Sequence, residues 1–192
     1  MSMLQFLKRL SASQTEAPYV GSDNPLPVAA GRVVVVTAPT MTRPADTTQY
    51  TTGDLVANST TAGSVVPLEF DVGGGSGMVR KIRIRTNRTS GGTTSAVFRV
   101  FLFRTAPTVA GGDNAAFNPA NAANFIDAMD VVINEQFSDG AANSSNGAAG
   151  EINYSLPDGS TKLFGLIRAG AAYTPTSAEQ ISVALEVLKD AV

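Results

Sequence analysis

The sequence predicts an all-β protein: an antiparallel, jelly-roll-like β-sandwich that follows an extended N-terminal arm. The first observation is composition, because eighteen glycines, ten prolines and only 16% charged residues among 192 are typical of a turn-rich β protein. The second is spacing, because about eight or nine short apolar segments alternate with turn residues. The third is the lack of long helical periodicity, which the crossover connections of a parallel sheet require.

We expect two regions: residues 1–31 form the arm, and residues 32–192 form a single jelly-roll-like β-sandwich domain. Apolar residues recur every third position from Leu4 to Leu10, which indicates a short helix, and the proline-bearing run 25–31 is expected to be extended. Two interpretations stay open, since the arm is either a frayed terminus or a segment that docks on a neighbouring subunit. In the second case the contact residues are Met3, Leu4, Phe6, Leu7 and Leu10.

The first half of the sandwich shows short strand patterns separated by turns. Residues 32–38 (RVVVVTA) are a β-branched run, and 54–57 (DLVA) and 65–71 (VVPLEFD) are shorter strands. Pro67 marks the third of these as an edge strand or a bulge, because proline cannot donate to a central ladder. Residues 73–77 (GGGSG) form a turn.

Two longer strands follow, over residues 78–86 (MVRKIRIRT) and 95–105 (SAVFRVFLFRT). The connection between them, NRTSGGTT, is short and rich in turn residues. This spacing predicts a hairpin in which the two strands pair directly.

The middle of the chain has weaker patterns. Residues 106–124 are rich in Ala, Asn and Gly and predict a long loop that can hold one helical turn. Residues 125–137 (FIDAMDVVINEQF) fit helix or strand, and three β-branched residues favour strand from about residue 129. Residues 138–150 are expected to be a flexible loop.

The last strands are expected at residues 151–156, 162–169 and 180–188. The third has the clearest alternation, with apolar residues at every second position sharing one face. These residues are Ile181, Val183, Leu185 and Val187.

The absence of two residue types limits the chemistry. The chain has no cysteine and no histidine, which removes thiol nucleophiles, the usual general base and the commonest transition-metal ligands. Asp127, Asp130 and Glu135 could approach a hard cation, but no calcium-loop pattern is present. We therefore expect no enzyme activity, no cofactor and no metal site.

No run of about 18 apolar residues indicates a membrane span. Lys8 and Arg9 follow the short apolar run instead of preceding it, so no secretory signal is expected.

The polar run from residue 39 to 59 (PTMTRPADTTQYTTGDLVANS) does not fit helix or central strand. Pro44 favours an extended conformation at Arg43 and denies the backbone a donor. We interpret the run as an ordered surface strap, with Arg43, Asp46 and Tyr50 as candidate assembly contacts. The alternative is that these residues, with Asp54, hold the strap to its own sandwich.

Positive charge is concentrated in one segment, because seven of the fourteen basic residues and no acidic residue lie between Asp71 and Asp113. Strand alternation places Lys81, Arg83 and Arg85 on one face and Arg80 with Ile82 and Ile84 on the other. Two interpretations remain. Either the basic face contacts an acidic partner, or carboxylates on neighbouring strands neutralise it: Glu69, Asp71, Glu135 or Glu186. The net charge of −2 argues against a dedicated nucleic-acid binder.

Five runs cover roughly residues 38–188: MTRPADTTQYTTGDLVANSTTAG, VVPLEFDVG, MVRKIRIRT, NFIDAMDVVINEQFSDGAANSSNGAAGEINY and KLFGLIRAGAAYTPTSAEQISVALEV. Together they resemble a group of small tailed-phage virion structural proteins. The resemblance implies a virion component without defined chemistry.

The resemblance favours a capsid decoration (cement) protein that binds the outer surface of a phage head and bridges capsid subunits. Its expected partners are the major capsid protein and neighbouring virion subunits, in a homo-oligomer for which a trimer is favoured. It would be made in the host cytoplasm and reside in the virion, with no nucleic-acid or membrane partner. Candidate contacts are the arm, the strap residues and the basic face of Lys81, Arg83 and Arg85. The alternative is a receptor- or carbohydrate-binding module of a tail fibre or baseplate.

Overall fold

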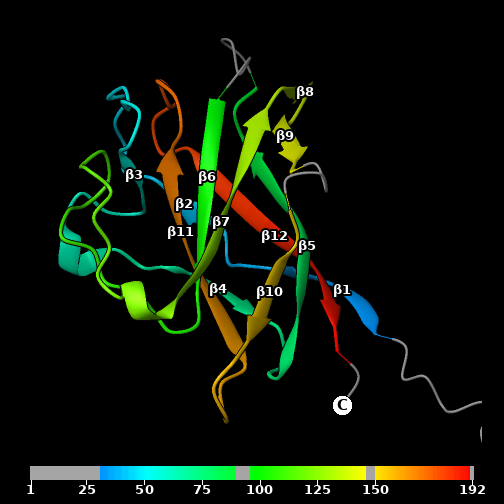
Figure 1. Ribbon diagram of the computed structural model, residues 1–192. Helices are drawn as coiled ribbons and strands as arrows, with labels where there is room; N and C mark the ends of the chain where they lie inside the picture. Colours follow the sequence, from blue (N-terminus) through cyan, green and yellow to red (C-terminus); the bar gives the residue numbers. More distant parts are fainter. Residues whose placement is uncertain (1–30, 90–95, 146–149, 191–192) are drawn as a thin grey trace, which may run out of the picture. The chain divides into compact units, whose positions relative to one another are not determined.

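The computed structural model describes residues 31–89, 96–145 and 150–190, which belong to one compact unit, Gly31–Val192. In these residues twelve strands form two antiparallel sheets that pack face to face (Figure 1). The strands are β1 (Arg32–Thr37), β2 (Met41–Thr42), β3 (Leu55–Val56), β4 (Leu68–Asp71), β5 (Ser76–Thr86), β6 (Ala96–Phe103), β7 (Phe125–Ile133), β8 (Glu135–Phe137), β9 (Gly140–Ser144), β10 (Ile152–Ser155), β11 (Lys162–Ala169) and β12 (Gln180–Lys189). Two short 3-10 helices, η1 (Ala62–Ser64) and η2 (Ala122–Asn124), lie in the connections.

The strand order defines a jelly roll. Sheet 1 has the order β1-β12-β5-β9-β8, with β2 beside β12 and β10 beside β5. Sheet 2 has the order β3-β11-β6-β7, with β4 beside β11. The pairs are nested along the chain, from β1 with β12 at the outside to β6 with β7 at the centre. A long hairpin that is folded over into two sheets gives this nesting, so the predicted jelly-roll-like sandwich is confirmed.

The core lies between the two sheets and is built by residues at alternating strand positions. On β12 the predicted row is confirmed, because Ile181, Val183, Leu185 and Val187 are all fully buried. Sheet 2 contributes the buried residues of β6, among them Phe98, to the same cluster. Burial of one such side chain stabilises the fold by about 1.5–3 kcal/mol.

The predicted hairpin of residues 78–86 and 95–105 is wrong. β5 pairs with β12, β9 and β10 in sheet 1, whereas β6 pairs with β11 and β7 in sheet 2. Both strands carry one apolar face, and that pattern is the same whether two strands lie side by side or face each other across a core.

The predicted position of Arg80 is also wrong, because a β-bulge interrupts β5. Its register against β12 changes from Lys81 opposite Glu186 to Val79 opposite Val187, which leaves Arg80 as the extra residue. The bulge allows Val79 and Ile82 both to face the core, and Arg80 lies exposed beside Glu151 at 3.6 Å.

The middle of the chain holds more strand than the sequence predicted. β7 begins at Phe125 instead of near residue 129, and β9 lies inside the run 138–150 that was expected to be a loop. The segment 106–124 is mainly irregular and ends in the single turn of η2, as predicted. The residues expected to form the helix of the N-terminal arm lie outside the described part of the chain.

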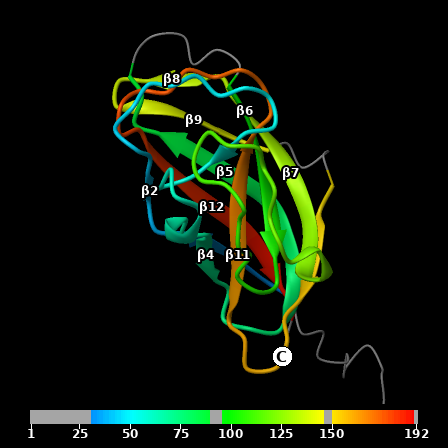
Figure 2. The ribbon, with the colours of Figure 1, turned by 90° about the vertical axis from the view of Figure 1, so that its left-hand side faces the viewer.

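The protein's own connections cover the outer side of sheet 2 over β11 and β6 (Figure 2), whereas Phe125 and Val132 of β7 stay partly exposed. The segment between β6 and β7 bonds to the strap, with 2.8 Å from the Asn114 nitrogen to the Leu55 oxygen and 2.9 Å from the Phe117 nitrogen to the Gly53 oxygen. A second apolar cluster fills the space beneath it. Its members are Leu55, Ala57, Phe103 and Leu166, with Val65, Phe101, Val109, Phe117 and Phe164 packed around them.

Candidate functional site

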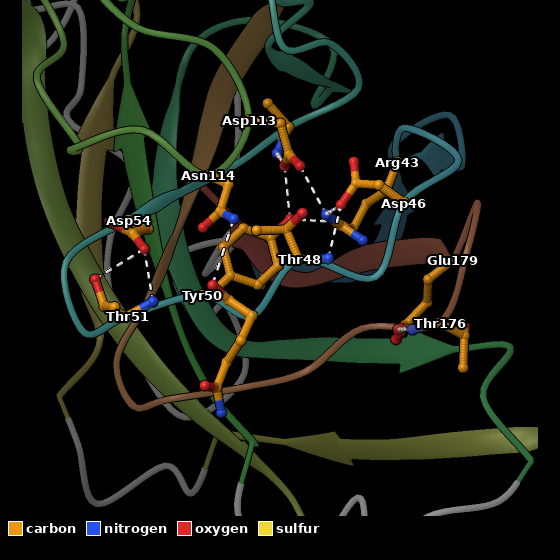
Figure 3. Close-up of polar contacts among 12 residues, drawn as sticks. Arg43, Asp46, Thr48, Tyr50, Thr51, Asp54, Asp113, Asn114, Thr176 and Glu179 are labelled. Carbon is orange, nitrogen blue, oxygen red and sulfur yellow. Dashed lines mark hydrogen bonds and ion pairs between the residues drawn. The ribbon is translucent and has the colours of Figure 1, made fainter.

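The polar strap is locked to its own domain by a buried network of Arg43, Tyr50 and Asp113 (Figure 3). Arg43 Nη2 donates to Asp113 Oδ2 at 2.7 Å, and Arg43 Nε donates to the Tyr50 hydroxyl. That hydroxyl donates to Asp113 Oδ1 at 2.6 Å, and the Ala57 backbone nitrogen donates to the same oxygen at 2.7 Å. One carboxylate therefore joins the strap to the connection between β6 and β7.

A second polar contact holds the strap from the other side. The Tyr50 ring stacks on Tyr173 with 6.2 Å between centroids, and the two residues form a backbone bridge. The Tyr173 hydroxyl donates to buried Glu179, whose other carboxylate oxygen accepts from the Thr176 nitrogen at 2.9 Å. The Arg43 nitrogen in turn donates to the Glu179 carbonyl at 3.0 Å, so the strap joins the segment that leads into β12.

The electrostatics of this network favour fixed protonation states. Burial disfavours the charged guanidinium, but Tyr50 and Asp113 outweigh it and raise the pKa of Arg43. Burial, followed by the hydrogen bond to Asp113, raises the pKa of Tyr50 far above its ordinary value. Both shifts keep the Arg43 guanidinium charged and the Tyr50 hydroxyl neutral near neutral pH, so the donors of this network stay protonated and its hydrogen bonds persist.

Two of these positions correct the interpretation of the whole run as a surface strap. Arg43 and Tyr50 are only 2% and 0% exposed, so neither side chain can meet a partner directly. Asp46 is more exposed and accepts from the Thr48 nitrogen at 2.9 Å, with its other contact to Arg43 at 3.8 Å. The alternative interpretation, that these residues hold the strap to its own sandwich, describes the geometry of Arg43 and Tyr50.

The outer face of sheet 1 carries the basic residues of β5 between small side chains of its neighbouring strands. Strand registers align outward-facing residues in rows across it: Thr37, Ala184, Arg83 and Ser144 form one row. The next row is Ser182, Arg85, Ala142 and Glu135. Small side chains therefore flank the two arginines on both sides.

Because these side chains are small, the outer face of sheet 1 has a groove of about 430 Å³. Its floor is formed by Ser182, Ala184 and Ala142, and Phe137 stands at its edge with 56% of its surface exposed. On β1, two further valines of this face are exposed, Val33 at 48% and Val35 at 57%.

Carboxylates neutralise most of the basic face. Arg83 Nη2 lies 3.1 Å from Glu186, one of the expected partners, and Arg85 Nη2 lies 2.7 Å from Asp139 in the turn between β8 and β9. In the described part of the chain Lys81 forms no ion pair within 4 Å. Lys81, Arg83 and Arg85 do share one face, as predicted, but ion pairs make that face close to neutral.

Two features of these sites have no signal in the sequence. Asp113 lies in an Ala- and Asn-rich connection with no periodicity, so nothing in the sequence relates it to Arg43. The groove depends on which strands lie beside β5, and the hairpin prediction placed the wrong neighbour there. The arm residues Met3, Leu4, Phe6, Leu7 and Leu10 lie outside the described residues, and their contact stays a prediction.

Within the described ranges no three acidic side chains gather in a way that could hold a metal ion. Among the same residues, no helix is both long and apolar enough to cross a membrane.

No protein-family model matches the chain. No curated protein matches it either. Among solved structures, a chain described as "Cyanophage Pam1 capsid asymmetric unit" aligns over 94% of this chain and 96% of its own length, with 15% identity and a TM-score of 0.35.

Proposed function

We propose that this chain is a structural protein of a tailed-phage head, specifically a decoration protein that binds the outer shell surface and bridges capsid subunits. The sequence runs that resemble small tailed-phage virion proteins support this role. The observation that carries the proposal is the difference between the two outer faces of the sandwich.

One outer face is largely covered and the other is open, although Phe125 and Val132 of β7 stay exposed beside the cover, at 39% and 42%. Sheet 2 is covered by connections that bury a second apolar cluster, including Phe103 and Leu166. Sheet 1 instead exposes Val33 and Val35 on β1, and Phe137 beside the groove on β8. Exposed apolar groups that gather on one surface mark interaction sites more often than single scattered ones do.

The chemistry of the open face suits a protein surface. Its floor of alanine and serine leaves room for larger side chains of a partner, and the stems of Arg83 and Arg85 add apolar wall. Because ion pairs neutralise these arginines, a polyanion would gain little from them. We therefore assign the face to a capsid subunit.

The mechanism requires no deep site. A protein that repeats over a shell lattice adds many modest contacts, and linkage through the lattice multiplies their effect. The buried hydrogen bonds of Arg43, Tyr50 and Asp113 hold the strap to the sandwich and would oppose its local unfolding under force.

The alternative role, a sugar-binding module of a tail fibre or baseplate, is less well supported. Sugar sites use exposed aromatic platforms, chiefly Trp and Tyr. The chain has no tryptophan, and the three described tyrosines, Tyr50, Tyr154 and Tyr173, are buried.

The test is binding to emptied heads of the phage whose genome carries this gene. We expect saturable binding at a fixed ratio to the major capsid protein. Phe137→Ser should weaken it, whereas Val66→Ser, at a valine that is 62% exposed and does not line the groove, should leave it unchanged. Binding to host cells or glycans but not to heads would contradict the proposal.

A further inference from the structure

β1 is the edge strand of sheet 1 and has one unpaired side. It pairs with β12 over Arg32–Lys189 to Thr37–Ala184, and no strand of the described residues pairs with its other side. In Figure 1, β1 (blue) lies beside the end of β12 at the margin of the sheet.

The hydrogen-bond pattern shows which backbone groups of β1 have no partner among the described residues. The Ala38 nitrogen donates to the Val183 oxygen at 3.0 Å, and these residues continue the register of β1 with β12. Bonded positions alternate along an antiparallel pair, so Val34 and Val36 also bond to β12. The N–H and C=O groups of Val33, Val35 and Thr37 therefore point toward the open edge.

Nothing within β1 protects this edge. Soluble proteins commonly block a free edge with proline, a bulge or an inward-pointing charge. The strand RVVVVT contains no proline or glycine, its one charge is at its first residue, and its register is unbroken. Its outward valines, Val33 and Val35, are about half exposed.

We propose that this edge pairs with β1 of a second copy, antiparallel, about a two-fold axis at Val35. Each Val35 then lies opposite Val35 of the other copy, and each Val33 lies opposite Thr37. Three free residues on each strand supply the donors and acceptors for about six hydrogen bonds between the copies. The strand is therefore complementary to itself.

Charge also permits this register. Arg32 lies opposite Ala38 of the second copy, so the two guanidinium groups lie at opposite ends of the pair, about 20 Å apart along six residues of strand. Like charges directly opposite each other would oppose the pairing, and this register avoids them.

The pairing would join two copies of sheet 1 into one continuous sheet, with both grooves on the same outer surface. It does not depend on the virion role proposed above. Because the strands are short, the contact is small and the dimer depends on concentration. The contact differs from the trimer that the resemblance favours, and solution measurements separate the two.

Disulfide trapping tests the register directly, since the full-length chain contains no cysteine. Val35→Cys places two thiols opposite each other with about 5.5 Å between Cα atoms, which a disulfide can span. Val33→Cys is the matched control, because its two thiols would lie about 14 Å apart along the strands. A mixture of the Val33→Cys and Thr37→Cys proteins should cross-link, because those positions are opposite each other.

A second comparison uses no cross-link. Val35→Lys puts two positive charges on the axis and should raise the dimer dissociation constant about fivefold or more, measured by sedimentation. Val35→Thr keeps the backbone donor and the β-branched shape and should pair like the parent. Circular dichroism should show the same fold in both. A monomer at all concentrations, equal trapping of the Val35→Cys and Val33→Cys proteins, or an oligomer that Val35→Lys leaves intact would overturn the proposal.

Discussion

Arg43 and Asp113 lie seventy positions apart in the sequence, yet their side chains form a buried ion pair with 2.7 Å between Nη2 and Oδ2. Both side chains have no exposed surface. The pair joins the strap to the connection that covers sheet 2, so the cover and the strap form one structural unit.

Removing the carboxylate charge should be costly. Asp113→Asn leaves the Arg43 guanidinium buried without its counter-charge, and we expect a loss of about 3–5 kcal/mol in the free energy of unfolding. Urea denaturation measures it. The matched control is Asp130→Asn, which breaks the exposed pair with Arg99 and should cost at most about 1 kcal/mol. Equal losses would show that the buried pair is not a main support of the fold.

Removing either of two buried tyrosine hydroxyls should change the stability of the fold in a different way. Tyr50→Phe takes away a hydroxyl that bonds to both Arg43 and Asp113, and the groups left unpaired should cost about 1–3 kcal/mol. The Tyr154 hydroxyl is buried and has no hydrogen-bond partner among the described residues. Tyr154→Phe should therefore leave the free energy of unfolding unchanged or raise it. Thermal melts of the two variants and the parent measure the difference. A larger loss for Tyr154→Phe than for Tyr50→Phe would contradict the network.

Alkaline pH should unfold the protein. Burial first, and then neighbouring carboxylates, raise the pKa of Tyr50 and of Tyr173 above the ordinary value of 10.0. Above pH 10 the unfolded chain releases tyrosine protons that the folded chain keeps, so stability is full below pH 10 and falls above it. Above pH 10 the free energy of unfolding should fall by about 1.4 kcal/mol per pH unit for each such tyrosine.

The measurement is unfolding free energy from pH 8 to 12, with tyrosinate absorbance recorded in parallel. Tyr50→Phe should make the fall in unfolding free energy with pH less steep by the contribution of one tyrosine. If more than two of the four tyrosines ionise near pH 10 while the fold persists, at least one of these two hydroxyls is not held as described.

The backbone at Gly112 packs closely against the backbone of Thr60 in the cover of sheet 2. A Cβ at Gly112 would lie 2.1 Å from backbone atoms of Thr60, so Gly112→Ala should lower the melting temperature by several degrees. Gly63→Ala is the matched control in the facing segment, because a Cβ there meets nothing within 4 Å. Similar melting temperatures for both variants would show that the cover is not closely packed.

The sequence predicted the fold class because local patterns determine it. The alternation at Ile181, Val183, Leu185 and Val187 identified both a strand and its buried face. β9 was not predicted, because its residues GAANS have low strand propensity and are held by pairing with β5 and β8.

The sites were harder to predict because they depend on contacts distant in sequence. The polar appearance of Arg43 and Tyr50 suggested a surface, but a buried charge needs only a partner, and that partner is Asp113. The basic face was recognised from the positions of Arg83 and Arg85, whereas the Asp139 partner follows from the turn between β8 and β9. Pairing across sheets has no local pattern that a single sequence reveals.

The most direct test of the proposed role is a reconstruction of emptied heads incubated with the purified protein, at a resolution that separates β-strands. We expect density on the outer shell surface with the outer face of sheet 1, including Phe137 and the groove, toward the capsid subunits. Contact through the cover of sheet 2, or heads without added density at saturating protein, would contradict the account.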